Sequence, residues 1–267
     1  MVLGTGATWY ARRSTGADMQ IFHNDGLWTH RVGHYFFPDS PRFEYFADSF
    51  AKSSHQADEY FATARDYWFR YYEPRRGDII IDVGAGCGED TLAFSHAVGD
   101  SGRVLAIEAH PGTFRRLEMF CRLNRLSNTS PLWLALMGKS GTVSMIESEH
   151  WERQSIDWTN VRSDEQVPAS TLDALCEHEQ IKDIAFLKMN IEGAERDAIR
   201  GMVKSIQYIK RICIACHDFR ADRGDGEHFR TRATVEQFLR DHGFTLAYRQ
   251  DDHRSYVRDH IYGSRQS

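Results

Sequence analysis

The residues best suited to chemistry stand where a run of β-branched residues passes into a glycine-rich turn, Ile79 to Gly88. A strand, a glycine turn and a helix in this order bring the backbone close to a ligand at the carboxyl edge of a parallel sheet. The pattern is D-x-G-x-G-x-G, and Glu89 occupies the place where the dinucleotide fingerprint G-x-G-x-x-G needs its third glycine. Glu89 and Asp90 would also repel a pyrophosphate at the helix N-terminus. The turn therefore predicts a ligand site that suits a dinucleotide poorly.

A carboxylate, Glu108, ends the next predicted strand. At the tip of that strand it can accept hydrogen bonds from ribose hydroxyls. NAD and S-adenosylmethionine both carry such hydroxyls, so Glu108 indicates a nucleoside without choosing the cofactor. Taken alone, a glutamate at this position also fits a solvated surface residue.

Two further side chains could accept a proton at the same edge of the sheet. Glu192 follows the fourth predicted strand and His217 follows the fifth. An imidazole with an ordinary pKa of about 6.5 can accept a proton at neutral pH, which makes His217 a candidate general base. The alternatives are a glutamate stabilised by a helix dipole and a histidine hydrogen-bonded in the core. Lys188, inside the fourth strand, is either a charge behind the site or a structural lysine.

Strands and helices that alternate along the chain must position these candidates. From Asp78 onward short β-branched runs alternate with helical stretches, which predicts an α/β fold with a parallel sheet covered on both faces. The predicted strands are 78–83, 103–109, 131–137, 184–191, 211–216, 244–250 and 256–262, with a short extended segment at 141–147. The predicted helices are 89–98, 111–126, 172–176, 194–206 and 235–242. Because the connection between the last two strands is too short for a crossover helix, we expect the last strand to be antiparallel.

The N-terminal part of the chain shows no such alternation. Segments 19–23 and 27–31 flank Asn24-Asp25-Gly26, a turn sequence that predicts a β-hairpin. Aromatic and small residues recur every three or four positions from Ala57 to Tyr72, which predicts an amphipathic helix that ends before Pro74. We expect its aromatic face to pack against the sheet domain as core, with a lid over the site as the sharper alternative.

Length and composition narrow the remaining possibilities. A chain of 267 residues with 41% hydrophobic and 27% charged residues is typical of a globular protein and excludes collagen, coiled coil and extensive disorder. Residues 1–76 are expected to form a hairpin and helical cap, and residues 77–267 the ligand-binding sheet domain. A net charge of -5 argues against nucleic acid or an anionic membrane as partner. Five scattered cysteines and the lack of a signal-peptide or membrane-spanning pattern favour a soluble protein of the reducing cytoplasm.

Several short motifs follow one another in the order of a known enzyme family. They are Asp82-Val83-Gly84-Ala85-Gly86, Ala106-Ile107-Glu108, Ala135-Leu136, Thr171-Leu172-Asp173 and Leu187-Lys188-Met189-Asn190-Ile191-Glu192-Gly193-Ala194-Glu195. Over roughly Tyr72 to His217 the chain resembles the FkbM family of S-adenosylmethionine-dependent methyltransferases. The resemblance implies a Rossmann-like, seven-stranded class I methyltransferase sheet whose last strand is antiparallel. It also implies O-methylation of a sugar, or of a hydroxyl or carboxyl group in secondary metabolism.

The resemblance implies S-adenosylmethionine as cofactor and a small-molecule acceptor as partner. The expected cofactor-binding residues are Asp82, Gly84, Ala85, Gly86, Glu108, Ala109, Ala135, Leu136 and Asn190, and the expected catalytic residues are His217 and Glu192. Two positions depart from the family pattern, with Asn190 in place of an aspartate and Cys216 in place of a glutamate. Because an amide and a thiol bind hard cations more weakly than carboxylates do, we expect no metal.

Two other functions stay open at this point. A nicotinamide-dependent oxidoreductase is disfavoured by the missing third glycine and by the antiparallel closing strand. A scaffold that binds the cofactor without turnover is compatible with the departures at Asn190 and Cys216. The acceptor, the regiochemistry and the oligomeric state also stay open.

Overall fold

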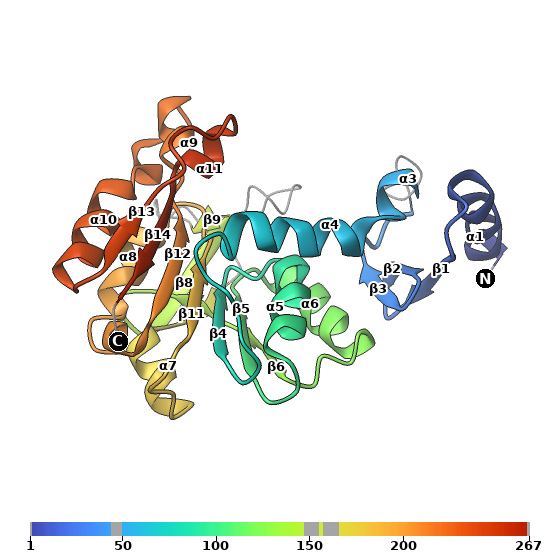
Figure 1. Cartoon of the computed structure of the whole chain (residues 1–267). Coiled ribbons are helices and arrows are strands. Elements are labelled where there is room, and N and C mark those ends of the chain that lie inside the picture. Colours follow the sequence, from blue (N-terminus) through green and yellow to red (C-terminus); the bar gives the residue numbers. More distant parts are fainter. Residues whose placement is uncertain (1, 44–49, 147–154, 157–165, 266–267) are drawn as a thin grey trace.

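A seven-stranded sheet forms the centre of the molecule (Figure 1). The computed structural model describes residues 2–43, 50–146, 155–156 and 166–265. The strands, in the order in which they pair, are β13 (Thr245–Ala247), β14 (His260–Ser264), β12 (Arg211–Ala215), β11 (Phe186–Met189), β4 (Ile79–Val83), β5 (Arg103–Glu108) and β6 (Thr129–Trp133). β14 is antiparallel to both neighbours, and the pairs from β12 to β6 are parallel. The predicted seven-stranded sheet with an antiparallel last strand is confirmed.

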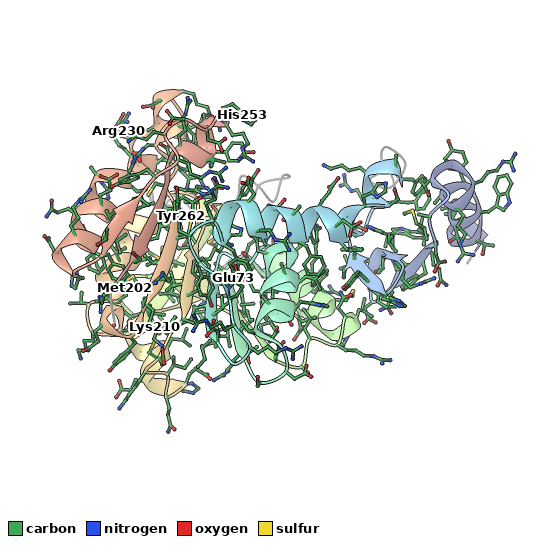
Figure 2. The ribbon with its side chains drawn as sticks, viewed as in Figure 1. Glu73, Met202, Lys210, Arg230, His253 and Tyr262 are labelled. Carbon is green, nitrogen blue, oxygen red and sulfur yellow. The ribbon has the colours of Figure 1, made fainter. Side chains whose placement is uncertain are left out.

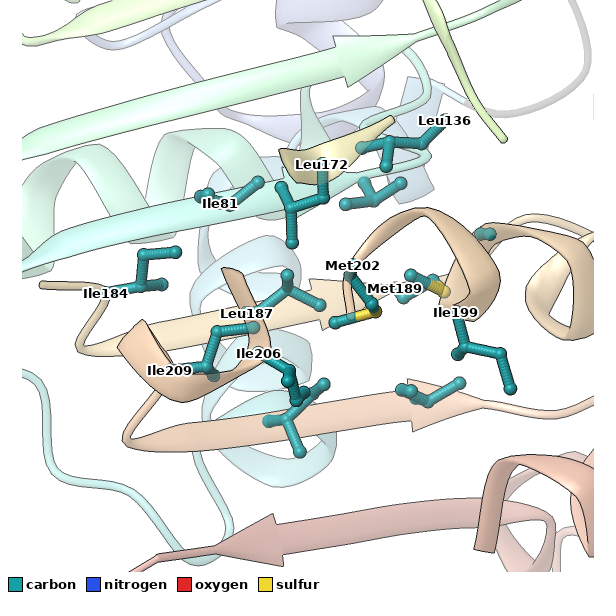
Figure 3. Close-up of a cluster of buried hydrophobic side chains, with 14 of the residues drawn as sticks. Ile81, Leu136, Leu172, Ile184, Leu187, Met189, Ile199, Met202, Ile206 and Ile209 are labelled. Atoms are coloured by element: carbon teal, nitrogen blue, oxygen red, sulfur yellow. The ribbon is translucent and has the colours of Figure 1, made fainter. Parts of the chain in front are cut away.

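Helices cover both faces of the sheet because successive strand residues point into two different apolar clusters. Ile81 and Leu187 pack with Met202 on one face, in the cluster shown in Figure 3, whereas Ile80 and Phe186 pack on the other face. The first face is covered by α7 (Leu172–His178), α8 (Glu195–Ala198) and α10 (Arg232–Asp241). The second is covered by α5 (Glu89–Val98) and α6 (Pro111–Leu123). The bounds of α5 are those predicted.

The predicted helix over 194–206 is interrupted. α8 is followed by two 3₁₀ turns, Ile199–Gly201 and Ser205–Tyr208. A β-carbon on Gly201 would lie 2.1 Å from the carbonyl oxygen of Met137. The backbone at Gly201 therefore packs directly against that of Met137, and the chain forms short 3₁₀ turns here where periodicity alone predicts a regular helix.

The predicted strand over 131–137 is divided between two sheets. Its first part is β6, and its last part is β7 (Ala135–Leu136), which pairs in parallel with β10 (Gln166–Ser170). β7 and β10 belong to a four-stranded sheet with β8 (Gly141–Ile146) and β9 (Ser155–Ile156). The chain therefore leaves the central sheet at the edge where a ligand is expected.

The last predicted strand is shorter than expected. β14 begins at His260, and Ser255–Arg258 forms a helical turn, α11. The pairing of β14 with β12 starts at His260 opposite Ala215, where β12 ends. Beyond this pair the ladder ends with one hydrogen bond, from the amide of Cys216 to the carbonyl of Asp259 at 3.3 Å.

The N-terminal elements extend to one side of the sheet domain (Figure 1). They are α1 (Val2–Thr15), β1 (Met19–Asn24), β2 (Leu27–Val32), β3 (Tyr35–Pro38) and α3 (Phe50–Ser53). The antiparallel pairing of β1 and β2 confirms the predicted hairpin. Neither α1 nor β3 was anticipated. Across the described ranges, no helix combines the length and the apolar character needed to span a membrane.

The predicted aromatic helix consists of α4 (Gln56–Thr63) and a π-helical turn, Ala64–Trp68. It crosses α5, with Phe61 against His96 at a ring distance of 5.3 Å and Phe69 against Phe94 at 5.0 Å. The expected packing of this face against the sheet domain is confirmed.

The connections near α9 (Asp218–Asp222) and α11 gather at one end of the molecule. Figure 2 shows Arg230 and His253 at this end, whereas Lys210, just before β12, lies at the opposite end. The first end holds the carboxyl termini of the parallel strands, where ligands bind in such sheets.

Candidate active site

Two cavities adjoin at the carboxyl edge of the sheet. The smaller has a volume of about 120 Å³ and the larger about 1300 Å³. Their walls share four residues, His110, Thr113, Asn190 and Glu192. Of the residues predicted at the cofactor, the smaller cavity is lined by Gly84, Gly86, Glu108, Ala109, Ala135, Leu136 and Asn190. The fold therefore brings most of the expected cofactor residues to one place.

The glycine turn after β4 is held against the neighbouring strands. Gly84 has a φ of +74°, and a β-carbon there would lie 1.9 Å from the carbonyl oxygen of Asn190. Its amide donates to the carbonyl of Ile107 at 2.9 Å. Only glycine meets both the left-handed backbone and this close approach. The turn consequently lies directly beside the end of β11.

Glu108 is fastened by backbone donors. Its Oε2 accepts from the amide of Gly86 at 2.9 Å, and its Oε1 accepts from the amide of His110 at 2.8 Å. Burial raises the pKa of this carboxyl to about 7, although both amides favour the charged form. Glu108 is therefore a partly buried wall of the smaller cavity rather than a solvated surface residue.

Two residues expected at the cofactor line neither cavity. Asp82 is fully buried beneath the turn, where its carboxylate accepts from Thr91 Oγ1 at 2.7 Å and from Lys188 Nζ at 2.9 Å. Ala85 is buried against the apolar side chains of α5 and α6. Both side chains are buried among protein atoms, so they support the turn from behind.

Lys188 is the cation at the centre of this support. Its Nζ donates to the carbonyl oxygen of Gly84 at 2.7 Å and lies 3.6 Å from Asp90. The indole of Trp68 covers it, with Nζ 5.1 Å from the ring centre. Although burial opposes the charge, Asp82 and Asp90 raise the pKa of Lys188. The sequence left open whether Lys188 is a charge behind the site or a structural lysine. The structure favours the first, because the charged side chain lies behind the glycine turn.

His217 lies between two carboxylates. Its Nε2 is 3.1 Å from Glu192, and its Nδ1 is 3.0 Å from the fully buried Glu195. Burial opposes the positive charge, but the two carboxylates outweigh it and raise the pKa of His217 to about 10. The ordinary pKa expected from sequence is therefore wrong, and at neutral pH the ring is an imidazolium.

Glu192 joins the two cavities. Its backbone is left-handed, with a φ of +51°, a strained conformation for a residue other than glycine. Its Oε2 accepts from Arg220 at 2.6 Å. Burial works against ionisation, but His217 and Arg220 together lower the pKa of Glu192. This carboxylate is ionised and stands where both cavities can reach it.

The larger cavity is formed partly by the N-terminal elements. Tyr60, Tyr67 and Trp68 from the aromatic helix line it together with Phe219 from α9 and Tyr256 from α11, and the hydroxyls of Tyr67 and Tyr256 are 2.9 Å apart. Trp68 and Tyr60 also pack in the apolar clusters with residues of α5 and α6, so the same rings serve both the core and the cavity wall. The expected packing as core is confirmed, and a covering role over the site stays a prediction.

Sequence reasoning missed two residues of this arrangement. Glu195, the first residue of α8, follows Glu192 by three positions across a non-helical turn, so helical spacing gave no signal for this pair. Arg220 carried no signal either, because its contact with Glu192 depends on how α9 folds back over the end of β11.

The topology and the edge site define a class I methyltransferase fold. A search of curated protein sequences found no match. The methyltransferase FkbM domain family matches residues 82–246, more than half of the chain. The chain belongs to this family, as the resemblance of its motifs implied.

A solved structure from the same family agrees in fold at low sequence identity. A methyltransferase FkbM from Methylobacillus flagellatus is similar with a TM-score of 0.51 and 14% identity, over 98% of this chain. The match covers 59% of that structure, so the chain spans less than two thirds of that protein. Fibrillarin from Aeropyrum pernix, solved with natively bound S-adenosylmethionine, gives a TM-score of 0.45 and 14% identity, over 91% of this chain and 81% of that one.

Proposed function

We propose that the protein transfers a methyl group from S-adenosylmethionine to an oxygen atom of a small molecule, such as a hydroxyl or carboxyl group of a sugar or secondary metabolite. The observation that carries this proposal is the junction of the two cavities at Glu192. The smaller cavity has a carboxylate suited to ribose, and the larger offers room for an acceptor. Family membership favours methyl transfer over hydride transfer.

The donor set of the smaller cavity fits the cofactor. Glu108 would accept from the ribose hydroxyls, and Ala135 and Leu136 would flank the adenine. Asn190 Oδ1 is buried with no hydrogen-bond partner among the described residues. A buried acceptor without a donor is costly unless a ligand supplies one. Cofactor binding therefore accounts for this atom.

When bound, S-adenosylmethionine supplies an electrophilic methyl group on a sulfonium. Much of the catalysis can then come from the cavity walls, which hold an acceptor oxygen in line. A hydroxyl acceptor must also lose a proton. We propose that the carboxylate of Glu192 accepts this proton and that the charged ring of His217 is its ion-pair partner. A carboxylate acceptor would need no base.

Incubation with isotopically methyl-labelled cofactor and a library of hydroxylated and carboxylated small molecules tests this function by mass spectrometry. We expect label on one class of acceptor, with equal turnover in EDTA. Among the described residues, no three His, Cys, Asp or Glu side chains are placed to hold a metal. Binding of the cofactor without any methyl transfer would favour a scaffold. Binding of NAD alone would favour an oxidoreductase. Turnover that is lost in EDTA and restored by magnesium would show a metal-assisted reaction. A set of RNA substrates in the same assay tests the expected absence of a nucleic-acid partner.

Affinity for S-adenosylhomocysteine is expected to rise about tenfold between pH 6 and pH 8. The pKa of Glu108, raised by burial to about 7, leaves the carboxyl largely protonated at pH 6, whereas two ribose hydroxyls are best accepted by the carboxylate. Calorimetric titration across this range measures the effect. Glu108→Gln should remove the pH dependence, and Glu108→Ala should weaken binding by roughly ten- to a thousandfold. Unchanged affinity in the alanine variant would remove Glu108 from the site.

A further inference from the structure

One histidine at this edge of the sheet, His260, has no part in the proposed proton transfer. It lines the larger cavity but not the smaller one. It is the first residue of β14 and pairs with Ala215, where β12 ends. The residue is 4% exposed, so its ring is largely enclosed by protein. Because β12 ends at the carboxyl edge of the sheet, His260 belongs to the wall of the space proposed for the acceptor.

Two aromatic rings fix the plane of the His260 imidazole. The imidazole stacks on the indole of Trp68, with 5.1 Å between ring centres and 12° between ring planes. Tyr67 meets it at nearly a right angle, with 6.1 Å between ring centres. Stacked and edge-to-face contacts at these distances are the arrangements that aromatic rings favour. Since Tyr67 and Trp68 belong to the π-helical turn after α4, the N-terminal part of the chain holds a ring of the last strand.

The protein satisfies the ring nitrogens of His260 only in part. Nδ1 lies 3.5 Å from the hydroxyl of Tyr262, at the outer limit of a hydrogen bond. No described residue forms a hydrogen bond with Nε2. Most buried polar side-chain atoms in folded proteins are paired. A nitrogen without a protein partner in the wall of a cavity is therefore available to a ligand.

His260 differs from His217 in charge. Burial and the nearby cations His217, Arg249 and Arg254 lower the pKa of His260 to about 3, although Asp252 opposes the shift. The ring is therefore neutral at physiological pH, with one nitrogen that donates a hydrogen bond and one that accepts. The same cations disfavour a positively charged ligand group beside it. A hydroxyl suits this ring, because it can donate to the accepting nitrogen or accept from the donating one.

We propose that the imidazole of His260 binds a hydroxyl of the acceptor other than the group that is methylated, and so orients the acceptor in the larger cavity. The inference rests on the proposed transfer to a small molecule. It separates two tasks at the site. Glu192 would take the proton of the reacting group, whereas His260 would select the acceptor by a hydroxyl elsewhere on the molecule.

Steady-state kinetics test this role. The substrates are the acceptor that takes label in the transfer assay and its deoxy analogues, in each of which hydrogen replaces one hydroxyl that is not methylated. His260→Phe keeps a ring stacked on Trp68 and removes both nitrogens. It should raise KM for the acceptor about three- to thirtyfold, and leave kcat and the affinity for S-adenosylhomocysteine within about twofold. One deoxy analogue should show the raised KM in the wild-type protein and no further rise in the variant.

Two further variants and a reagent sharpen the test. His260→Gln, whose amide can hydrogen-bond a hydroxyl, should recover part of the lost affinity. His253→Phe changes an exposed histidine at the same end of the molecule and should leave KM unchanged. Diethyl pyrocarbonate, which acylates unprotonated imidazole nitrogens, should modify His260 at pH 7, and saturating acceptor should slow this reaction. His217, with a carboxylate at each nitrogen, should resist the reagent.

Three results would overturn the inference while the proposed function stands. If His260→Phe raises KM equally for the acceptor and for every deoxy analogue, the ring only shapes the cavity wall. If KM is unchanged in His260→Phe, or if His260 resists the reagent, Nε2 does not meet the acceptor. An acceptor without a second hydroxyl would have the same meaning. Wild-type protein that methylates no acceptor would overturn the proposed function together with the inference.

Discussion

Lys188→Met is expected to lower the free energy of unfolding by about 3–5 kcal/mol. The ammonium of Lys188 is 1% exposed, and its partner Asp82 is fully buried. Removing the ammonium leaves a buried carboxylate whose one remaining side-chain hydrogen bond among the described residues comes from Thr91. It also removes the donor to the carbonyl of Gly84, so the glycine turn loses one of its contacts with β11. Denaturant titration measures the loss of stability, and binding of S-adenosylhomocysteine should fall with it.

Two further variants make this prediction specific to the buried pair. Lys210→Met removes a lysine whose ion pair with Asp183 is largely exposed, and it should cost at most about 1 kcal/mol. The double variant Asp82→Asn with Lys188→Met should recover part of the loss, because it no longer buries an unpaired charge. A loss below about 1 kcal/mol for Lys188→Met would contradict a supporting role for the lysine.

Glu192→Gln is expected to lower kcat on a hydroxyl acceptor by about 10²–10⁴. The amide keeps the size of the side chain but cannot take up the proton at neutral pH. Because glutamine keeps the size of the side chain and an acceptor oxygen, the affinity for S-adenosylhomocysteine should change little although Glu192 lines both cavities. Since His217 stays charged until the pH approaches 10, the wild-type rate should show no inflection near pH 6.5 from this ring. Steady-state kinetics over pH 5.5 to 9 measure both effects.

Asp225→Asn is the matched control for the second prediction. Asp225 binds Arg220 at 3.0 Å from the side away from Glu192 and does not line the cavity, so turnover should be nearly unchanged. His217→Ala should also slow the reaction, and it should reduce stability because Glu195 would be left buried without its partner. A loss below tenfold in Glu192→Gln with a hydroxyl acceptor would remove Glu192 as the base. An inflection near pH 6.5 that His217→Ala abolishes would make the neutral imidazole the base.

Local sequence pattern determined the elements that carry the cavities. β-branched runs and helical periodicity place β4, β5 and α5, and the glycines after β4 place the turn beside them. Glu108 was found because it ends a strand, and strand ends meet at one edge of a parallel sheet. Interruptions such as the one at Gly201 escaped prediction, because they depend on a carbonyl from a distant segment.

The pairing of charges was decided only by the tertiary structure. Asp82 and Lys188 are 106 positions apart, and their buried contact could not be predicted from local sequence. The pKa of His217 likewise depends on Glu192 and Glu195 meeting its two nitrogens from another strand end. Periodicity and turn propensity are properties of neighbouring residues, so the sequence by itself determined the family, the sheet and the edge of the site. Hydrogen bonds, burial and counterions join residues that are distant in the chain, so only the tertiary structure decided which side chains face the cavities and which are charged.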